Sequence, residues 1–271
     1  MSVNRPEGRG RFKPAKRSLG QNFLKDANIA RKIVDALGIQ PGDNVLEIGP
    51  GRGALTRHIL DRQPGRFMVL EKDDELAAVL SEQYPSIEIV QGDALAFPWN
   101  SLAPEDGWKI VGNLPYNIAS PLMWDIVSQS RFACAVFMVQ LEVGQRLRAP
   151  SGGRDYGALS VWVQSHALVD LLFKVPPQVF HPQPKVTSAV MRFILRPNTF
   201  EAKASKALAE TLHMCFQQRR KQLSTILKSK GIGGIVDLLA GIGVEPSQRP
   251  ETLAPEQFLE LSNRLQNQFG S

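Results

Sequence analysis

Short apolar runs alternate with amphipathic stretches along most of the chain from Asp26 onward. The runs are rich in Val, Ile, Leu and Phe and have the length of buried strands, and the stretches between them have the apolar period of helices. The predicted strands span residues 44–48, 66–71, 87–91, 109–112, 133–140, 168–175 and 186–195. The predicted helices span residues 28–37, 54–61, 74–83, 121–129, 142–148 and 158–166. This alternation predicts a mostly parallel sheet with helices on both faces.

The last two predicted strands differ from the others because no helix separates them. Only a proline-rich stretch, residues 176–184, joins them. We expect the two strands to pair antiparallel at an edge of the sheet, and a long connection of this kind is typical of a functional loop.

The pattern changes near residues 196–198. From there to Gln268 the apolar positions have a helical period, interrupted by glycines and Pro246. One face of the first helix is a core stripe, formed by Leu208, Leu212, Cys215 and Phe216. The chain therefore reads as an α/β protein with a Rossmann-like sheet and a small C-terminal all-helical domain.

The composition excludes several classes of protein. The chain has 271 residues, and its longest uninterrupted apolar run, residues 133–139, is far shorter than the ~18 residues of a membrane span. Two cysteines, Cys134 and Cys215, and four scattered histidines indicate neither a disulfide framework nor a metal site. We therefore expect a cytoplasmic protein that has no metal and no contact with a membrane.

The net charge of +6 is concentrated at the two ends of the chain. Residues 1–20 hold six basic residues and one acidic residue, residues 21–198 hold 17 and 18, and residues 199–271 hold nine and seven. The basic N-terminal segment is either a solvated arm or an arm that binds a polyphosphate backbone. It lacks the apolar stretch of a secretory signal, and its Pro and Gly content opposes the amphipathic helix of a mitochondrial transit peptide.

A glycine-rich loop, residues 47–53, lies between a predicted strand and a predicted helix. Glycines at this place let the backbone turn sharply and let a ligand lie against the main chain beside a helix N-terminus. Gly49, Gly51 and Ala54 even satisfy the dinucleotide fingerprint, and Glu71 follows at the spacing of a ribose-binding acid. A tight turn without a ligand is the alternative, but the position within a strand–helix–strand unit favours a nucleoside cofactor.

Two acidic residues end neighbouring strands and narrow the identity of the cofactor. Glu71 ends the second strand, where a carboxylate can accept two hydrogen bonds from a ribose diol. Asp93, within Gly92-Asp93-Ala94, follows the third strand and can accept from an adenine amine. A ribose contact and a base contact without a loop for two phosphates favour S-adenosylmethionine over NAD(P). The alternative for either acid is a helix N-cap.

The most specific motif is Asn113-Leu114-Pro115-Tyr116, directly after the fourth strand. An aromatic amine is a poor nucleophile because its lone pair is delocalised into the ring. The Asn113 side-chain oxygen and the Leu114 carbonyl can each accept one of its N–H groups. Pro115 fixes the turn, and Tyr116 offers a ring on which a base can stack. The alternative is an Asn-Pro turn with a buried Tyr, which the preceding cofactor motifs disfavour.

A series of motifs in this order resembles the ribosomal RNA adenine dimethyltransferases, from about Ser18 to Leu261. The motifs are Gln21-Asn22-Phe23-Leu24, Glu-x-Gly-Pro-Gly, Glu71, Gly92-Asp93-Ala94, Asn113-Leu114-Pro115-Tyr116, Phe180-His181-Pro182-Gln183-Pro184-Lys185-Val186 and Phe216-Gln217-Gln218-Arg219-Arg220-Lys221. The resemblance implies a class I methyltransferase fold and S-adenosylmethionine as the methyl donor. It also implies dimethylation of the 6-amino groups of two adjacent adenosines near the 3′ end of small-subunit (16S) ribosomal RNA.

The resemblance also implies roles for individual residues. The residues that would line the cofactor site are Asn22, Leu24, Gly49, Glu71, Asp93 and Asn113. Asn113 to Tyr116 would hold the target amine, and Phe180 would close the other face of the adenine opposite Tyr116. The target base must then be unstacked or in a loop. Arg52 departs from the small or apolar residue of several relatives, and the sequence assigns it no role.

The resemblance favours an RNA backbone role for several cations, since arginine-rich loops around a pocket position a substrate without specifying its sequence. These are Arg146, Arg148 and Arg154 after the fifth strand, and Arg219, Arg220 and Lys221 in the C-terminal part. A solvated helix face is the alternative for the last three. The expected divisions are a basic, flexible arm at residues 1–20, an S-adenosylmethionine-binding catalytic domain at 21–197 and a helical RNA-binding domain at 198–271.

The implied partner is small-subunit ribosomal RNA within an immature 30S particle, bound by a monomer with a part in small-subunit biogenesis. The nearest rival within the enzyme class is the large-subunit RNA adenine methyltransferase that confers macrolide resistance, but residues 180–186 and 217–221 fit the small-subunit enzymes better. A DNA adenine methyltransferase would need a separate target-recognition domain. A ribosome-assembly or transcription factor that retains the fold is the rival from another class, and the intact Asn113, Glu71 and Asp93 argue against it.

Overall fold

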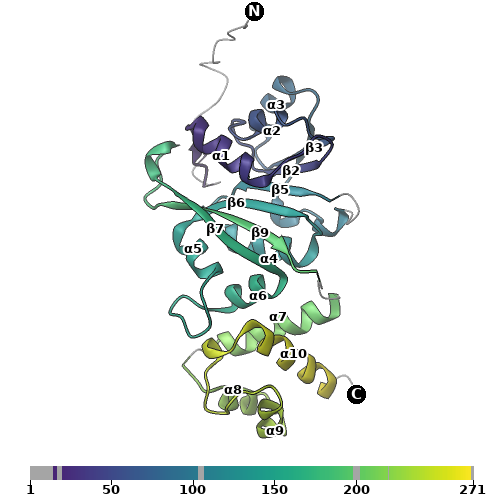
Figure 1. Ribbon diagram of the computed structural model, residues 1–271, viewed down its shortest axis with the longest axis vertical. Helices are drawn as coiled ribbons and strands as arrows, with labels where there is room; N and C mark the ends of the chain where they lie inside the picture. Colours follow the sequence, from purple (N-terminus) through teal and green to yellow (C-terminus); the bar gives the residue numbers. More distant parts are fainter. Residues whose placement is uncertain (1–14, 17–19, 103–106, 198–201, 219, 270–271) are drawn as a thin grey trace, which may run out of the picture.

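A seven-stranded sheet forms the centre of the protein (Figure 1), seen in a computed structural model that describes residues 15–16, 20–102, 107–197, 202–218 and 220–269. Its strands, in chain order, are β2 (Asn44–Ile48), β3 (Arg66–Glu71), β4 (Glu88–Gln91), β5 (Lys109–Asn113), β6 (Cys134–Gln140), β7 (Ala167–Val175) and β9 (Ser188–Leu195). Their order across the sheet is β4-β3-β2-β5-β6-β9-β7. Each predicted strand is confirmed, with ends that shift by two residues at most.

The sheet is parallel from β4 to β6 and antiparallel at its other end, where β9 pairs with both β6 and β7. The predicted antiparallel edge pair is therefore confirmed. Because the parallel strands all end at one side, the loops that follow β2, β3, β4 and β5 converge there.

Six helices cover the two faces of the sheet. They are α1 (Ala27–Leu37), α2 (Thr56–Leu60), α3 (Asp74–Gln83), α4 (Ala119–Gln129), α5 (Leu141–Leu147) and α6 (Ala158–His166), with short 3-10 turns η2 (Ala94–Ala96), η3 (Trp99–Ser101) and η5 (Pro177–Val179). Neighbouring strand residues point to opposite faces, so Val45 packs in the core with α1, whereas Leu46 packs in the core with α4 and α6. The helix predicted at residues 54–61 is shorter, because residues 51–55 form turns before α2 begins.

Two short strands that the sequence pattern does not predict form a separate ribbon. β1 (Phe23–Leu24) pairs antiparallel with β8 (Phe180–His181), with Leu24 opposite Phe180. The N–H of Lys25 donates to the carbonyl of Val179 at 2.8 Å and extends this pairing. The ribbon fastens the segment before α1 to the long connection between β7 and β9.

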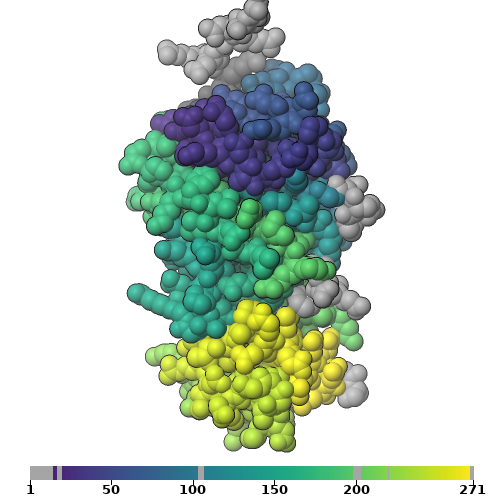
Figure 2. All heavy atoms as spheres, in the orientation of Figure 1, coloured from purple at the N-terminus to yellow at the C-terminus, as the bar shows by residue number. Residues whose placement is uncertain are grey.

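The C-terminal part is helical as predicted and consists of α7 (Ala202–Phe216), α8 (Leu223–Ser229), α9 (Ile235–Ala240), the 3-10 turn η6 (Pro250–Thr252) and α10 (Pro255–Phe269). It forms one end of the elongated molecule, below α6 in Figure 1, and its yellow surface in Figure 2 adjoins the teal surface of the α/β part. The predicted stripe on α7 packs in the same core cluster as residues of α4 and α6, and Leu208 and Leu212 are fully buried. The Tyr156 hydroxyl donates to the Leu253 carbonyl at 2.8 Å across the junction. The domain boundary at residue 197 stays a prediction.

Within the described ranges, the structure contains no helix that is both long enough and apolar enough to cross a membrane.

Candidate active site

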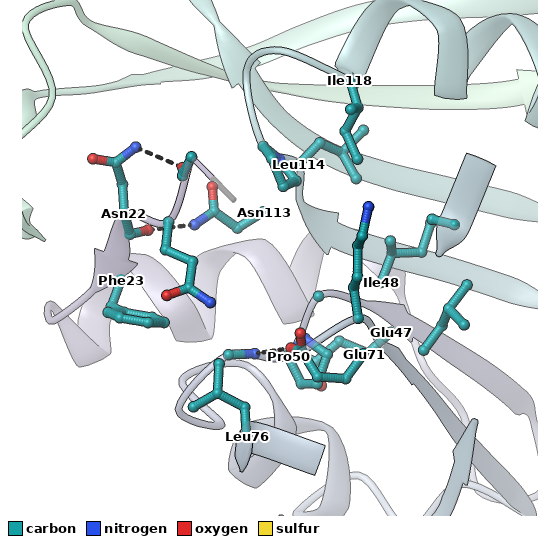
Figure 3. A pocket seen from close by; sticks show the side chains of 18 of the residues that line it. Asn22, Phe23, Glu47, Ile48, Pro50, Glu71, Leu76, Asn113, Leu114 and Ile118 are labelled. Carbon is teal, nitrogen blue, oxygen red and sulfur yellow. Dashed lines mark hydrogen bonds between the residues drawn. The ribbon is translucent and has the colours of Figure 1, made fainter. Parts of the chain in front are cut away.

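A cavity of about 150 Å³ lies at the carboxyl ends of β2, β3, β4 and β5 (Figure 3). Its walls come from residues 20–24, the glycine-rich loop, the ends of β3 and β4, and residues 113–118. Asn22, Leu24, Gly49, Glu71, Asp93 and Asn113, which the sequence assigns to a cofactor site, all line it, as do Leu114, Pro115 and Tyr116. The fold thus brings together residues as far apart in the chain as Asn22 and Tyr116, which are 94 positions apart.

The glycine-rich loop has a backbone that ordinary residues rarely adopt. Gly49 and Gly51 have φ angles of 61° and 58°, in the left-handed region that favours glycine. A Cβ at Gly51 would stand 3.1 Å from the Phe23 ring, whereas a Cβ at Gly49 would meet no atom within 4 Å. The loop therefore packs against Phe23 and leaves open space along the main chain at Gly49.

Glu71 is held by backbone amides and is not a helix cap. Its side chain is buried, one oxygen accepts from the N–H of Gly51 at 3.1 Å, and the other accepts from the N–H of Asp73 at 2.9 Å. Burial raises the pKa of Glu71, and these hydrogen bonds oppose that rise. Asp73, not Glu71, caps α3, so the cap alternative for Glu71 is wrong.

Asp93 has two partners in the structure. It caps the turn η2 by accepting from the N–H of Leu95 at 3.0 Å, and its second oxygen contacts the Lys72 ammonium at 2.6 Å. The hydrogen bond from Lys72, followed by that from Leu95, holds the pKa of Asp93 below its ordinary value. Asp93 therefore caps η2 and also lines the cavity beside Lys72, so the cap does not exclude it from the site.

The side chain of Asn113 has a defined orientation at the end of β5. Its amide nitrogen donates to the carbonyl of Asn22 at 2.9 Å (Figure 3). The carboxamide oxygen is thereby left as the acceptor at this wall of the cavity. The next residue, Leu114, is fixed by its N–H, which donates to the Met138 carbonyl at 3.1 Å.

Tyr116 is anchored by β9, which lies two strands across the sheet from β5. Its hydroxyl shares a hydrogen bond of 2.8 Å with the hydroxyl of Ser188, the first residue of β9. Burial raises the pKa of Tyr116, so the phenol stays neutral. Its ring is thus held at the entrance to α4 beside Asn113.

Phe180 does not line the cavity in this structure. Its side chain is 1% exposed and packs in the core cluster that includes Leu24 and Val190. The sequence interpretation places its ring across the target adenine from Tyr116. That arrangement is not formed here, and the role of Phe180 stays a prediction that requires a shift of β8.

The predicted RNA-contacting cations lie away from the cavity in two groups. Arg146 pairs with Glu142 on α5 at 3.0 Å, and Arg148 and Arg154 are exposed in and before the loop that precedes α6. Arg220 and Lys221 are exposed between α7 and α8. Arg219 lies outside the described residues. A backbone hydrogen bond from Gly152 to Glu251, at 2.6 Å, ties the first loop to the C-terminal helices.

Sequence reasoning gave no role to several residues at this site. Glu47 is 1% exposed and lines the cavity, where its carboxyl accepts from the Thr56 hydroxyl at 2.7 Å. Burial raises the pKa of Glu47 to about 8, and the neighbouring charge of Glu71 adds to the rise. The sequence signal that could have identified Glu47 as a site residue is its position at the end of a buried strand, directly before the glycine-rich loop.

Arg52, to which the sequence assigns no role, packs on an aromatic ring at the edge of the cavity. Its guanidinium lies 4.4 Å from the centre of the Phe23 ring, and the residue lines the cavity. Such a stacked cation is stabilised by the ring's electron density. The contact fixes the glycine-rich loop against the segment before α1.

Comparison with known proteins agrees with this geometry. A model of the family described as ribosomal RNA adenine dimethylase matches residues 12–267. The chain is similar to the ribosomal RNA small subunit methyltransferase A of Maridesulfovibrio salexigens, with 51% identity over 257 residues, which is 95% of this chain and 98% of that protein.

Two solved structures have the same fold over most of their length. One is a dimethyladenosine transferase from Plasmodium falciparum, with a TM-score of 0.77 and 27% identity over 92% of this chain and 98% of that one. The other is the 23S rRNA methyltransferase ErmE, with a TM-score of 0.66 and 30% identity over 90% and 99%. Both similarities confirm the predicted Rossmann-like class I methyltransferase sheet.

Proposed function

The chain belongs to the ribosomal RNA adenine dimethylase family, and from that premise we propose that it dimethylates the 6-amino groups of two adjacent adenosines near the 3′ end of small-subunit ribosomal RNA. The methyl donor is S-adenosylmethionine. The similarity to a ribosomal RNA small subunit methyltransferase A over 95% of the chain supports the choice of substrate.

The observation that carries the proposal is the fixed carboxamide of Asn113. Because its nitrogen donates to Asn22 at 2.9 Å, its oxygen is available to accept an N–H of a substrate amine. A weakly nucleophilic amine gains most from being held in the correct orientation beside the methyl donor. The neutral amide also lets a monomethylated amine rotate and rebind for a second transfer.

The residues around the cavity fit S-adenosylmethionine by their chemistry. Both oxygens of Glu71 are oriented by backbone N–H groups and keep lone pairs for the two ribose hydroxyls. Gly49 leaves the main chain open to a ligand, and Asp93 is the acceptor for the adenine amine. Asn22 and Leu24 complete the opposite wall. When bound, the cofactor supplies an electrophilic methyl group on a sulfonium sulfur.

The remaining residues of the motif hold the target base. Each transfer forms a bond from the amine nitrogen to the methyl carbon, breaks the bond from that carbon to sulfur, and releases one proton from the amine. The Asn113 oxygen and the Leu114 carbonyl accept hydrogen bonds from the N–H groups of the amine, and the anchored ring of Tyr116 stacks on the base. Phe180 would cover the other face of the base after a shift of β8.

Contact with RNA outside the pocket is assigned to the exposed cations. Arg148 and Arg154 precede α6, and Arg220 and Lys221 lie between α7 and α8. Both groups can neutralise backbone phosphates and so hold the particle without reading its sequence. We further propose that the protein acts as a cytoplasmic monomer on an immature 30S particle, because a single chain builds the whole cavity.

The substrate is tested by supplying labelled S-adenosylmethionine with unmethylated small subunits, large subunits, naked small-subunit RNA and DNA in parallel. We expect label to enter small-subunit particles, at two methyl groups on each of two adjacent adenosines. Preferential labelling of large subunits or of DNA would overturn the proposal. Binding to particles without any labelling would favour an assembly factor that retains the fold.

The Asn113→Ala variant tests the role of the amine acceptor in the same assay. It removes the amine acceptor, so we expect transfer to fall at least ~100-fold, as for other lost transition-state hydrogen bonds. Particle binding should change little, because Asn113 lines the cavity, whereas none of the exposed cations assigned to RNA does. Equal activity in the variant would mean that another group accepts the amine hydrogens.

A further inference from the structure

The carboxylate of Asp73 is the centre of a hydrogen-bond network that no motif predicted. Its side chain is 3% exposed and accepts from the Lys16 ammonium at 2.9 Å and from the Gln21 amide at 3.0 Å. It also caps α3 by accepting from the N–H of Glu75 at 3.1 Å. The backbone N–H of Asp73 donates in turn to Glu71 at 2.9 Å.

Gln21 begins a segment, residues 20–25, that we call the strap. The backbone N–H of Lys16 donates to the Gln21 carboxamide oxygen at 2.7 Å, so both ends of that side chain are fixed. Further along, the Asn22 carbonyl accepts from Asn113, and Leu24 pairs with Phe180 in the ribbon of β1 and β8. The strap therefore joins the ribose-binding side of the cavity to the target-amine side.

The strap is also attached by the ribbon of β1 and β8, by the hydrogen bond from Asn113 to Asn22 and by the packing of Arg52 on Phe23. The ribbon of β1 and β8 contains two residues in each strand, and so short a pair is only marginally stable by itself. Hydrogen bonds between charged groups are the stronger ones in proteins, so the contact of Lys16 with Asp73 is a substantial anchor. Burial alone would raise the pKa of Asp73, but the hydrogen bonds from Lys16 and Gln21 hold it below its ordinary value, so the carboxylate stays charged.

Neither Lys16 nor Asp73 lines the cavity, whereas Gln21, Asn22, Phe23 and Leu24 all do. Asp73 and Lys16 contact the cavity wall through the Gln21 side chain and through the hydrogen bond from Asp73 to Glu71. We propose that Asp73 is a positioning residue that, with Lys16, holds the strap closed and so forms the wall shared by the cofactor and the target amine. This inference rests on the proposed function, since it concerns the same cavity.

The test uses the full-length protein and S-adenosylhomocysteine as the binding probe. Asp73→Asn keeps a side chain that caps helices well but removes the charge that Lys16 contacts. Lys16→Met removes the cationic partner of Asp73 in the same ion pair. Asp74→Asn is the matched control, because it removes the same charge one residue away, from a side chain that is 73% exposed and lies 3.6 Å from Lys16.

Three quantities are measured for each variant. They are the Kd for the probe by calorimetry, the hydrogen exchange of the strap without ligand, and the KM for S-adenosylmethionine against kcat. If the strap is closed for a smaller fraction of the time, the apparent Kd rises in proportion. We expect a rise of about tenfold in Asp73→Asn and about fivefold in Lys16→Met, the order expected for a lost charge-assisted hydrogen bond, with faster exchange in residues 20–25.

The double variant distinguishes a joint role from two separate ones. Because Lys16 and Asp73 form one contact, we expect the Kd of the double variant to rise little beyond that of Asp73→Asn. In each variant the KM for S-adenosylmethionine should rise more than kcat falls. Unchanged Kd and strap exchange in Lys16→Met and Asp73→Asn, or effects that multiply in the double variant, would overturn the inference.

Failure of the proposed function has a different signature. In that case the wild-type protein itself would not bind S-adenosylhomocysteine, and this would overturn the assignment of the cavity. The exchange of the strap is measured without ligand, so it still tests the contact between Lys16 and Asp73.

Discussion

Two buried carboxyl groups, Glu47 and Glu71, face the same cavity, and burial raises the pKa of each. They differ in their partners. Glu71 accepts from two backbone N–H groups, whereas Glu47 accepts from the hydroxyl of Thr56. Two hydrogen bonds from the main chain favour the ionised form, so Glu71 is the better acceptor for a ribose diol and Glu47 is the carboxyl that holds a proton near neutral pH.

The proton on Glu47 makes stability depend on pH. Its pKa is about 8 in the folded protein and 4.5 as an ordinary value. Between those values the folded protein binds a proton that the unfolded chain has released, so the free energy of unfolding falls as the pH rises through this window. The contribution is fully present below the lower value and is lost above the higher one.

We therefore predict that Glu47→Gln flattens this dependence, because a carboxamide keeps the hydrogen bond from Thr56 but does not titrate. The measurement is the midpoint of thermal unfolding without ligand, at about pH 5.5 and about pH 7.5. The wild-type midpoint should fall more than that of the variant between the two conditions. Parallel slopes for the two proteins would show that Glu47 is ionised in the folded state throughout.

At the scale of elements, period and strand composition predict the sheet because each strand is long enough to repeat its pattern. The strands β1 and β8 have two residues each, too few to show any period. They form because the segment before α1 crosses the connection between β7 and β9 in space. Sequence reasoning therefore identified the motifs around Asn22 and Phe180 but not that they pair.

This pairing places the ring of Phe180 in the core, at 1% exposure. Two variants separate its contribution to core packing from its proposed stacking on the target adenine. Phe180→Ala removes most of the ring volume and should cost about 3–5 kcal/mol of unfolding free energy. Phe180→Leu keeps most of it and should cost less than about 1.5 kcal/mol.

If the ring covers the target adenine during the reaction, Phe180→Leu should bind S-adenosylhomocysteine normally yet methylate particles about tenfold more slowly, the size of a lost base stack. Initial rates on small-subunit particles give the comparison. A Leu variant with the wild-type rate would mean that the ring only packs and that β8 keeps its place.

For the whole molecule, the N-terminal charge is tied to the cavity. The first 20 residues carry six basic residues. One of them, Lys16, contacts Asp73, and the backbone N–H of Asp73 donates to Glu71 in the cavity wall. The sequence pattern predicts an arm at residues 1–20 that is either solvated or bound to a polyphosphate backbone, with no part in the cavity. The contact of Lys16 argues instead that this arm has two parts.

Two deletions test the division. Removing residues 2–14 takes away Arg5, Arg9, Arg11 and Lys13 and should lower the salt dependence of particle binding by up to about three in the logarithmic slope, with cofactor affinity unchanged. Removing residues 2–17 should also weaken S-adenosylhomocysteine binding, because Lys16 is lost. Equal cofactor affinity in the two deletions would return the whole arm to a role in RNA docking alone, and an unchanged salt slope would leave it a solvated tail.

The sequence by itself determined the sheet, the helical C-terminal part, the glycine-rich loop and the residues that follow each strand. These features depend on the local period of apolar residues, on backbone freedom at glycine and on chain position. All three can be read from short segments of sequence. Because parallel strands end at one edge, it also followed that Glu71, Asp93 and Asn113 gather there.

Only the tertiary structure decided which groups those residues meet. The orientation of Asn113 depends on a carbonyl 91 positions earlier in the chain, and the contact of Lys16 with Asp73 spans 57 positions. The burial of Phe180 and the raised pKa of Glu47 likewise depend on what packs around each side chain. Burial, partner and orientation are properties of the folded chain, because hydrogen bonds and desolvation act between residues that only folding brings within reach.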